Sequence, residues 1–188
     1  MQNVNRLGGA IMTIPKFHPG DIFFIMSTDN RLSRWIAWFM DSKFSHSGMI
    51  LEETARRIYT CETSDLEVAY FDLEHYLNDT TIVLEVLRLP VRLETGEEMA
   101  AEATKYARTI YGYLQLFFSF SIRELIRKVF RRIVPNFIRQ GMVCCHVILY
   151  ACKKSGIQRL EEQDPEGIQT QETYELLKKC GAVVIYQK

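Results

Sequence analysis

Two residues of this sequence, Cys144 and His46, have the chemistry of a thiol nucleophile and its base. A cysteine attacks a carbonyl carbon well when its pKa is lowered, a base lies within reach, and a third group orients that base. Cys144 follows Gly141 at the predicted start of a helix, where unpaired amide groups and the helix dipole favour thiolate over thiol. The ordinary alternative is that Cys144 and Cys145 are small buried hydrophobic residues, as free cysteines usually are.

His46 and Glu62 are candidates for the base and its orienting carboxylate. His46 lies directly before an apolar strand, where an imidazole can reach into a cleft without being buried. Glu62 follows the predicted strand Arg57–Cys61, whose length and turn indicate pairing with the strand after His46. A carboxylate there can accept the second imidazole N–H and fix the tautomer of the ring. Taken singly, His46 could equally be a solvated or core histidine, and Glu62 is one of 23 acidic residues.

Hydrophobic periodicity predicts the elements that must position these side chains. Apolar runs bounded by turn residues predict strands at 22–26, 47–51, 57–61, 82–89 and 182–186. Apolar residues at helical spacing predict helices at 32–40, 144–154 and 171–179, and a further helix opened by a capping box at Thr95–Glu98. Strands followed by helices and one last strand favour an α+β fold over a doubly wound parallel sheet.

Size and composition predict one soluble domain. Residues 1–16 are expected to form a loosely ordered leader, and residues 17–188 a single domain. The N-terminus is a poor secretory signal, and the longest apolar-rich run, 113–122, is too short to span a bilayer. We therefore expect a cytoplasmic protein.

The charge and cysteine counts exclude several classes of protein. The 23 basic and 23 acidic residues cancel, so no global field attracts nucleic acid, and no nucleic-acid partner is expected. Five cysteines with no CxxC pair indicate neither a disulfide framework nor a zinc site, which suits a reducing compartment. Adjacent residues on a helix point in different directions, so Cys144, Cys145 and His146 should not form a metal site.

Four short motifs occur in an order that resembles a known family. They are Gly20-Asp21-Ile-Phe-Phe, Phe44-Ser-His46-Ser-Gly-Met-Ile, Thr60-Cys-Glu62 and Val143-Cys144-Cys-His-Val-Ile148. Together they resemble the circularly permuted NlpC/P60 superfamily of papain-like enzymes, in particular its YiiX/YebB-like group. In that family a Gly-Asp strand opens the fold, a His begins the next strand, a Glu follows on the paired strand, and the nucleophilic Cys comes last, at a helix start.

The resemblance implies a papain-like antiparallel sheet packed against helices, with the nucleophile at a helix N-terminus. It implies that Cys144 attacks, that His46 is the base, and that Glu62 orients His46. It also implies that Asp21 and the Tyr111-Gly112-Tyr113 element serve in substrate binding. The implied reaction is hydrolysis of an amide in a peptide, peptidoglycan or isopeptide through an acyl-enzyme, without a metal or another cofactor.

The residues after the cysteine depart from that family, which leaves other functions open. Cys145-His146 stands where the family typically has Ser-Glu. Cys-Xaa-His followed by aliphatic residues also resembles lecithin:retinol-acyltransferase-like proteins, which transfer acyl chains from phospholipids. Those proteins have Asn where this chain has Val143, and a second His near the first that this chain lacks. Lipid acyl transfer is therefore one alternative, and a non-catalytic binding protein that retains the fold is another.

The family motif has an aliphatic pair after the nucleophile. Aligning that pair with Val147-Ile148 places Cys144, rather than Cys145, at the nucleophile position. Cys145 is then expected to face away, about 100° round the helix. His146 is expected to be a residue of the helix face rather than a second base.

The segment Ser121–Arg139 combines an apolar stripe with five basic side chains over residues 122–132. It could bind an anionic membrane surface, which would make the protein membrane-peripheral. It could also wall a hydrophobic groove beside the cysteine, or pack on the core with its basic face in water. We expect the stripe to pack on the domain, because an exposed patch of that size is rare on soluble monomers.

Overall fold

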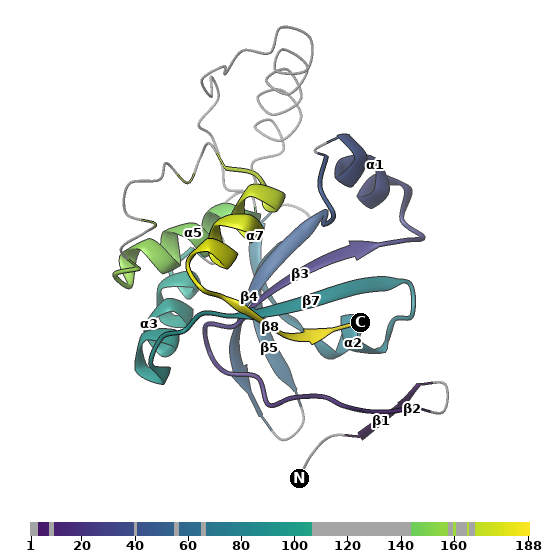
Figure 1. Ribbon diagram of the computed structural model, residues 1–188, viewed down its shortest axis with the longest axis horizontal. Coiled ribbons are helices and arrows are strands. Elements are labelled where there is room, and N and C mark those ends of the chain that lie inside the picture. Colours follow the sequence, from purple (N-terminus) through teal and green to yellow (C-terminus); the bar gives the residue numbers. More distant parts are fainter. Residues whose placement is uncertain are drawn as a thin grey trace, which may run out of the picture.

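A six-stranded antiparallel sheet organises the protein, with strand order β6-β5-β4-β3-β7-β8 (Figure 1). The computed structural model describes residues 4–7, 10–39, 41–54, 57–64, 67–106, 144–157, 160, 165 and 168–188. The strands of the sheet are β3 (Ile22–Ser27), β4 (His46–Glu53), β5 (Ile58–Ser64), β6 (Glu67–Asp72), β7 (Ile82–Arg88) and β8 (Val183–Gln187). An antiparallel sheet with helices packed against it confirms the α+β fold class.

The central strand β3 is apolar at successive positions because both faces of the sheet are covered. Ile22 and Phe24 belong to one buried cluster, whereas Phe23 and Ile25 belong to the other. Successive side chains of a strand point to opposite faces, so a continuous apolar run requires a core on each side. The two clusters lie on the two faces of this one sheet.

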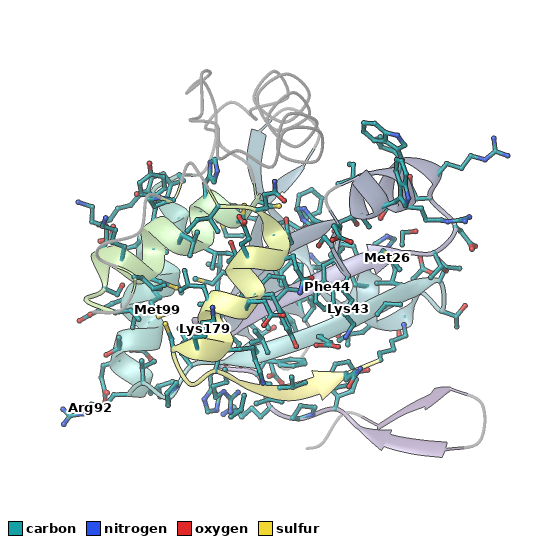
Figure 2. The ribbon with its side chains drawn as sticks, turned by 45° about the horizontal axis from the view of Figure 1, so that its top comes forward. Met26, Lys43, Phe44, Arg92, Met99 and Lys179 are labelled. Atoms are coloured by element: carbon teal, nitrogen blue, oxygen red, sulfur yellow. The ribbon has the colours of Figure 1, made fainter. Side chains whose placement is uncertain are left out.

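Helices supply most of the cover on the first face. These are α3 (Leu93–Thr104), α5 (Cys144–Lys154) and α7 (Thr170–Lys179), which contribute Met99, Val147 and Leu177 to the core shared with Ile22. Figure 2 shows Met99 pointing inward from α3, whereas Arg92, just before that helix, points away from the molecule. The second face is covered by the short helix α2 (Glu74–Asn78) and by the segment around Phe17.

The remaining elements lie outside these layers. Helix α1 (Arg31–Phe39) follows β3, and strands β1 (Val4–Leu7) and β2 (Ala10–Thr13) form a separate antiparallel hairpin. That hairpin lies in the predicted leader and was not predicted as strand, nor were β6 and α2. Among the described residues, no helix has the length and apolar character needed to cross a membrane. Tyr111, Tyr113 and the basic segment 122–132 lie outside the described residues.

The start of α3 corrects one expectation. The predicted capping box placed the helix start at Thr95, but α3 begins at Leu93 with Arg92 as its N-cap. Gly96 N–H donates to the Arg92 carbonyl at 3.1 Å, so the first turn is already closed two residues earlier than predicted. Thr95 lies inside the helix, where its side chain cannot cap the end.

Two glycines, Gly20 and Gly96, allow the chain just before β3 to pack closely on α3. Gly20 has φ +84°, and a Cβ on it would lie 2.7 Å from Gly96 Cα. A Cβ on Gly96 would in turn lie 2.4 Å from the Pro19 carbonyl oxygen. Only glycine allows these two backbones to approach so closely, and the contact fixes where the sheet begins relative to α3.

Candidate active site

Cys144 is the first residue of α5, as the sequence predicts. Its side chain is largely buried, at 6% exposure, and its Sγ lies 3.9 Å from Thr170 Oγ1, the first residue of α7. The amide groups of a first helical turn lack partners within the helix, so they direct positive partial charge toward this sulfur.

His46 is the first residue of β4, and its ring connects Cys144 to Glu62. His46 Nε2 lies 2.6 Å from Glu62 Oε2, and the interaction of the ring with Cys144 raises the pKa of His46. Because Nε2 bonds to the carboxylate, Nδ1 is the ring nitrogen that is left to interact with Cys144. The Phe23 ring lies edge-on to the imidazole, with ring centroids 6.4 Å apart, and limits its rotation.

Glu62 is buried, at 1% exposure, and is held by two further hydrogen bonds. Tyr76 Oη donates to Oε2 at 2.9 Å, and Thr60 Oγ1 donates to Oε1 at 3.2 Å. The predicted pairing of its strand with the strand of His46 is confirmed, with Glu62 opposite Gly48. Donors on both oxygens satisfy a carboxylate that burial would otherwise disfavour.

Gly48, within the Ser-His-Ser-Gly motif, is required by this packing. A Cβ at position 48 would lie 2.4 Å from the Phe23 ring and 2.9 Å from Glu62 Cβ. The missing side chain therefore lets Phe23 and Glu62 close around the imidazole.

The environment raises the pKa of His46 and lowers that of Cys144. Burial lowers the pKa of His46, but the hydrogen bonds to Cys144 and Glu62, together with their charges, outweigh it and raise the pKa to about 10. A hydrogen bond from Cys145 contributes most to holding the pKa of Cys144 well below its ordinary value. The interaction of Cys144 with His46, including the charge of the imidazolium, acts in the same direction, against burial. These shifts favour a thiolate–imidazolium pair.

The pKa of Cys145 is shifted in the opposite direction from that of Cys144. Its hydrogen bond to Cys144 and its own burial raise the pKa of Cys145 well above the ordinary value. Its Sγ also lies 3.3 Å from the Ile168 carbonyl oxygen. The expectation that Cys145 faces away stays a prediction, and its interaction with Cys144 shifts the pKa values of the two thiols in opposite directions.

Several side chains of this cluster were not singled out from the sequence. Ser47 is fully buried. Its place next to His46 in the quoted motif is the feature of the sequence that could have indicated it. Thr60 also lies in a quoted motif, two residues before Glu62. Tyr76 comes from α2, an element that was not predicted, and nothing in its local sequence indicates its role. His146 is fully buried on α5.

Asp21 lies away from this cluster. In the pairing of β3 with β4, Ile25 lies opposite His46, whereas Asp21 precedes the other end of β3. Arg88 Nε and Nη2 donate to the two Asp21 carboxylate oxygens at 2.8 and 2.7 Å, and the His18 amide donates at 2.7 Å. These contacts are those of a buried structural ion pair. The predicted substrate-binding role of Asp21 stays a prediction.

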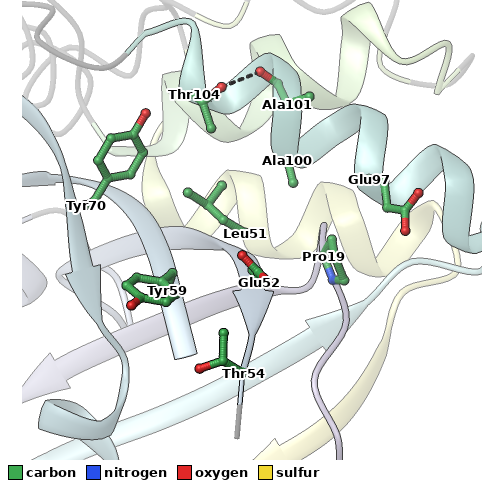
Figure 3. A pocket seen from close by; sticks show the side chains of 10 residues that line it. All are labelled: Pro19, Leu51, Glu52, Thr54, Tyr59, Tyr70, Glu97, Ala100, Ala101 and Thr104. Carbon is green, nitrogen blue, oxygen red and sulfur yellow. Dashed lines mark hydrogen bonds between the residues drawn. The ribbon is translucent and has the colours of Figure 1, made fainter. Parts of the chain in front are cut away.

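A pocket of about 710 Å³ opens between α3 and the strands β4 to β6 (Figure 3). Tyr59 and Tyr70 lie at one end and Glu97 at the other, with Leu51 and Ala100 between them. Cys144, His46 and Glu62 do not line this pocket.

The similarity of this chain to known proteins is structural. No family model matches the chain, and no curated protein matches its sequence significantly. Among solved structures, the metalloprotein YiiX from Escherichia coli O157:H7 superimposes with a TM-score of 0.53 at 15% sequence identity. The alignment covers 91% of this chain and 97% of the YiiX chain.

The description of YiiX as a metalloprotein applies to that protein. Over the described residues of this chain, no three His, Cys, Asp or Glu side chains are arranged to hold a metal ion. Likeness at 15% identity concerns the fold alone. In fold, this chain is an α+β, papain-like protein similar to YiiX.

Proposed function

We propose that the protein is a cysteine hydrolase that cleaves an amide bond through an acyl-enzyme. The observation that supports this most directly is that His46 is hydrogen-bonded to Glu62 and interacts with Cys144, whose sulfur lies at the start of α5. Nucleophile, base and orienting carboxylate are the three components of a catalytic triad. The substrate classes proposed are peptide, peptidoglycan and isopeptide amides.

In the first half of the reaction, the Cys144 thiolate attacks the carbonyl carbon of the substrate. A carbon–sulfur bond forms, and the carbonyl electron pair moves to oxygen, where amide groups at the start of α5 can stabilise the negative charge. The His46 imidazolium then gives its proton to the amide nitrogen. The carbon–nitrogen bond breaks, the amine leaves, and the acyl group remains on Cys144 as a thioester.

In the second half, neutral His46 takes a proton from water as the water oxygen attacks the thioester. The tetrahedral intermediate expels the Cys144 thiolate, and the acyl group leaves as a carboxylic acid. Glu62 stabilises the imidazolium in both halves and holds the ring in one orientation. Tyr76 and Thr60 fix the Glu62 carboxylate, so we propose them as positioning residues.

Two experiments test this proposal in sequence. Iodoacetamide at about pH 6, where ordinary thiols react slowly, should label one cysteine, and peptide mass spectrometry should locate the label on Cys144. A p-nitrophenyl ester should then give a burst of nitrophenolate and an acylated Cys144. Cys180, which is half-buried, serves as the internal reference thiol.

Equal labelling of Cys144 and Cys180 would contradict the proposed activated thiol and favour a non-catalytic binding protein. If the acyl group leaves Cys144 only when an alcohol or amine acceptor is added, the result would instead favour the acyltransferase alternative.

A further inference from the structure

Both tryptophans of the chain lie on α1, and both are exposed to solvent. Trp38 is 73% exposed, Trp35 is 42% exposed, and Leu32 on the same helix is 52% exposed. Tryptophan is highly buried in most proteins, so two exposed indoles on one nine-residue helix indicate a surface that binds something.

The exposed face of α1 also carries its positive charges. At about 100° per residue, Arg34, Trp38, Arg31, Trp35 and Leu32 follow one another round a sector of roughly 160°. Within the described part of the chain, Arg31 and Arg34 are exposed and make no ion pair. No acidic residue lies on the helix, although Asp29 and Asp41 flank it.

The opposite face of α1 is attached to the strand that carries His46. Ala37 is buried, and Ser33 Oγ lies 2.5 Å from Ser45 Oγ, in the residue directly before His46. The Ser27 amide also donates to Ser33 Oγ at 3.1 Å. The helix is thus fixed through its polar and small residues, and its indoles and guanidinium groups are exposed. Figure 1 shows α1 at the edge of the molecule, away from the helices α3, α5 and α7.

We propose that α1 binds an anionic lipid bilayer, with Trp35, Trp38 and Leu32 inserted at the interface and Arg31 and Arg34 against lipid phosphates. Indole rings favour the level of the headgroups, and guanidinium groups are attracted to anionic lipid. The contact through Ser33 and Ser45 would place His46 beside the bilayer. Binding does not depend on the proposed cysteine chemistry.

Tryptophan fluorescence of the full chain tests this directly, because every tryptophan signal comes from α1. Phosphatidylcholine vesicles containing phosphatidylglycerol should shift the emission to shorter wavelength, and brominated lipid should quench it. Pure phosphatidylcholine vesicles should produce a much smaller change. Vesicles that sediment the protein without shifting its emission would overturn the proposal, as would a failure to bind anionic vesicles.

Matched variants separate the two components of the surface. Arg31→Gln with Arg34→Gln should weaken binding about 30-fold, from roughly five-fold for each charge. Arg57→Gln with Arg92→Gln removes the same charge elsewhere and should leave binding unchanged. Trp38→Ala should weaken binding roughly tenfold or more, judged by co-sedimentation, with unchanged melting temperatures showing that the variants fold. Equal effects of the two arginine pairs would refute α1 as the binding surface.

Discussion

The two adjacent cysteines show how neighbours, rather than residue type, assign a chemical role. Cys144 lies at a helix start within reach of His46, Ser47 and the Cys145 thiol, all of which favour its thiolate. Cys145 is one residue further along, and its contacts and burial favour the protonated thiol. A buried donor next to a thiolate stabilises the charge that the proposed attack needs.

Replacing each cysteine in turn should separate these roles. Cys144→Ala should abolish turnover, because no other described thiol contacts His46. Cys145→Ala should keep most activity and should raise the pKa of Cys144, because it removes a hydrogen bond to the thiolate. Steady-state rates and pH-dependent alkylation measure the two effects. An inactive Cys145→Ala beside an active Cys144→Ala would reverse the assignment.

The lowered pKa of Cys144 and the raised pKa of His46 predict that Cys144 reacts over a broad pH range. The lowered pKa of Cys144 keeps the thiolate present well below pH 9, and the imidazolium is lost only as pH rises through about 10. The raised pKa of His46 also stabilises the folded state. This contribution is complete when the pH is below the ordinary histidine pKa, and it is lost as the pH rises through about 10. Alkylation of Cys144 should therefore be nearly constant from mildly acidic pH to about 10. In His46→Ala, the pH of half-maximal alkylation should rise toward the ordinary thiol value of about 8.5 but stay below it, because Cys145 still lowers the pKa of Cys144.

Glu62→Gln should lower kcat without unfolding the domain. The amide can still accept a hydrogen bond from His46 but carries no charge to stabilise the imidazolium. We expect a loss of roughly 10²- to 10⁴-fold in kcat and a lower His46 pKa, which NMR titration can follow. An unchanged imidazole titration would show that Glu62 does not act through His46.

At the scale of elements, close backbone contacts determine where the site residues lie. Gly48 allows Phe23 and Glu62 to close around His46, and Gly20 allows the start of β3 to pack on α3. These contacts depend on the register in which β4 pairs with β3 and with β5. A one-residue shift in either pairing would move every side chain to the opposite face of the sheet.

Gly20→Ala should cost more stability than Gly156→Ala. Both glycines have positive φ, +84° and +77°, so both substitutions incur a left-handed backbone cost of about 1–2 kcal/mol. The added methyl at position 20 would also meet the Gly96 backbone at 2.7 Å, whereas nothing lies within 4 Å of a Cβ at position 156. The additional cost should be about 1–3 kcal/mol, measured by urea denaturation. Equal losses for the two variants would contradict this close contact.

At the scale of the whole molecule, Glu85 on β7 connects parts of the chain that are distant in sequence. This carboxylate is 2% exposed and accepts from Tyr174 Oη on α7 at 2.8 Å and from Gln187 Nε2 on β8 at 3.1 Å. It also pairs with Lys43, just before the strand of His46. The C-terminal helix and strand are thereby connected to the centre of the sheet.

Glu85→Leu should destabilise the protein by about 2–3 kcal/mol, because several hydrogen bonds to a charged group are lost. Lys43 is half-exposed, so its ammonium would be rehydrated rather than left buried without a partner. Tyr174→Phe removes one of these bonds and should cost about 1 kcal/mol. Urea denaturation measures both changes, and a loss for Glu85→Leu no larger than for Tyr174→Phe would argue against this connecting role.

The sequence by itself determined the order and approximate bounds of most elements in the sheet and its helices. Periodicity predicted a strand directly after His46, a helix that begins at Cys144, and a strand that ends directly before Glu62, because a local apolar pattern reports which face of an element is buried. In the structure, β4 begins at His46 and β5 includes Glu62. Periodicity missed β6 and α2, and it placed the start of α3 too late.

The tertiary structure decided what these residues contact. Tyr76 donates a hydrogen bond to Glu62 from α2, Arg88 binds Asp21 from 67 residues away, and the Cys145 thiol donates to the Ile168 carbonyl. Such partners depend on strand pairing and helix packing between distant segments, which local periodicity does not encode. The opposite directions of the pKa shifts of Cys144 and Cys145 follow from the surroundings of each thiol, so they too depend on the tertiary structure.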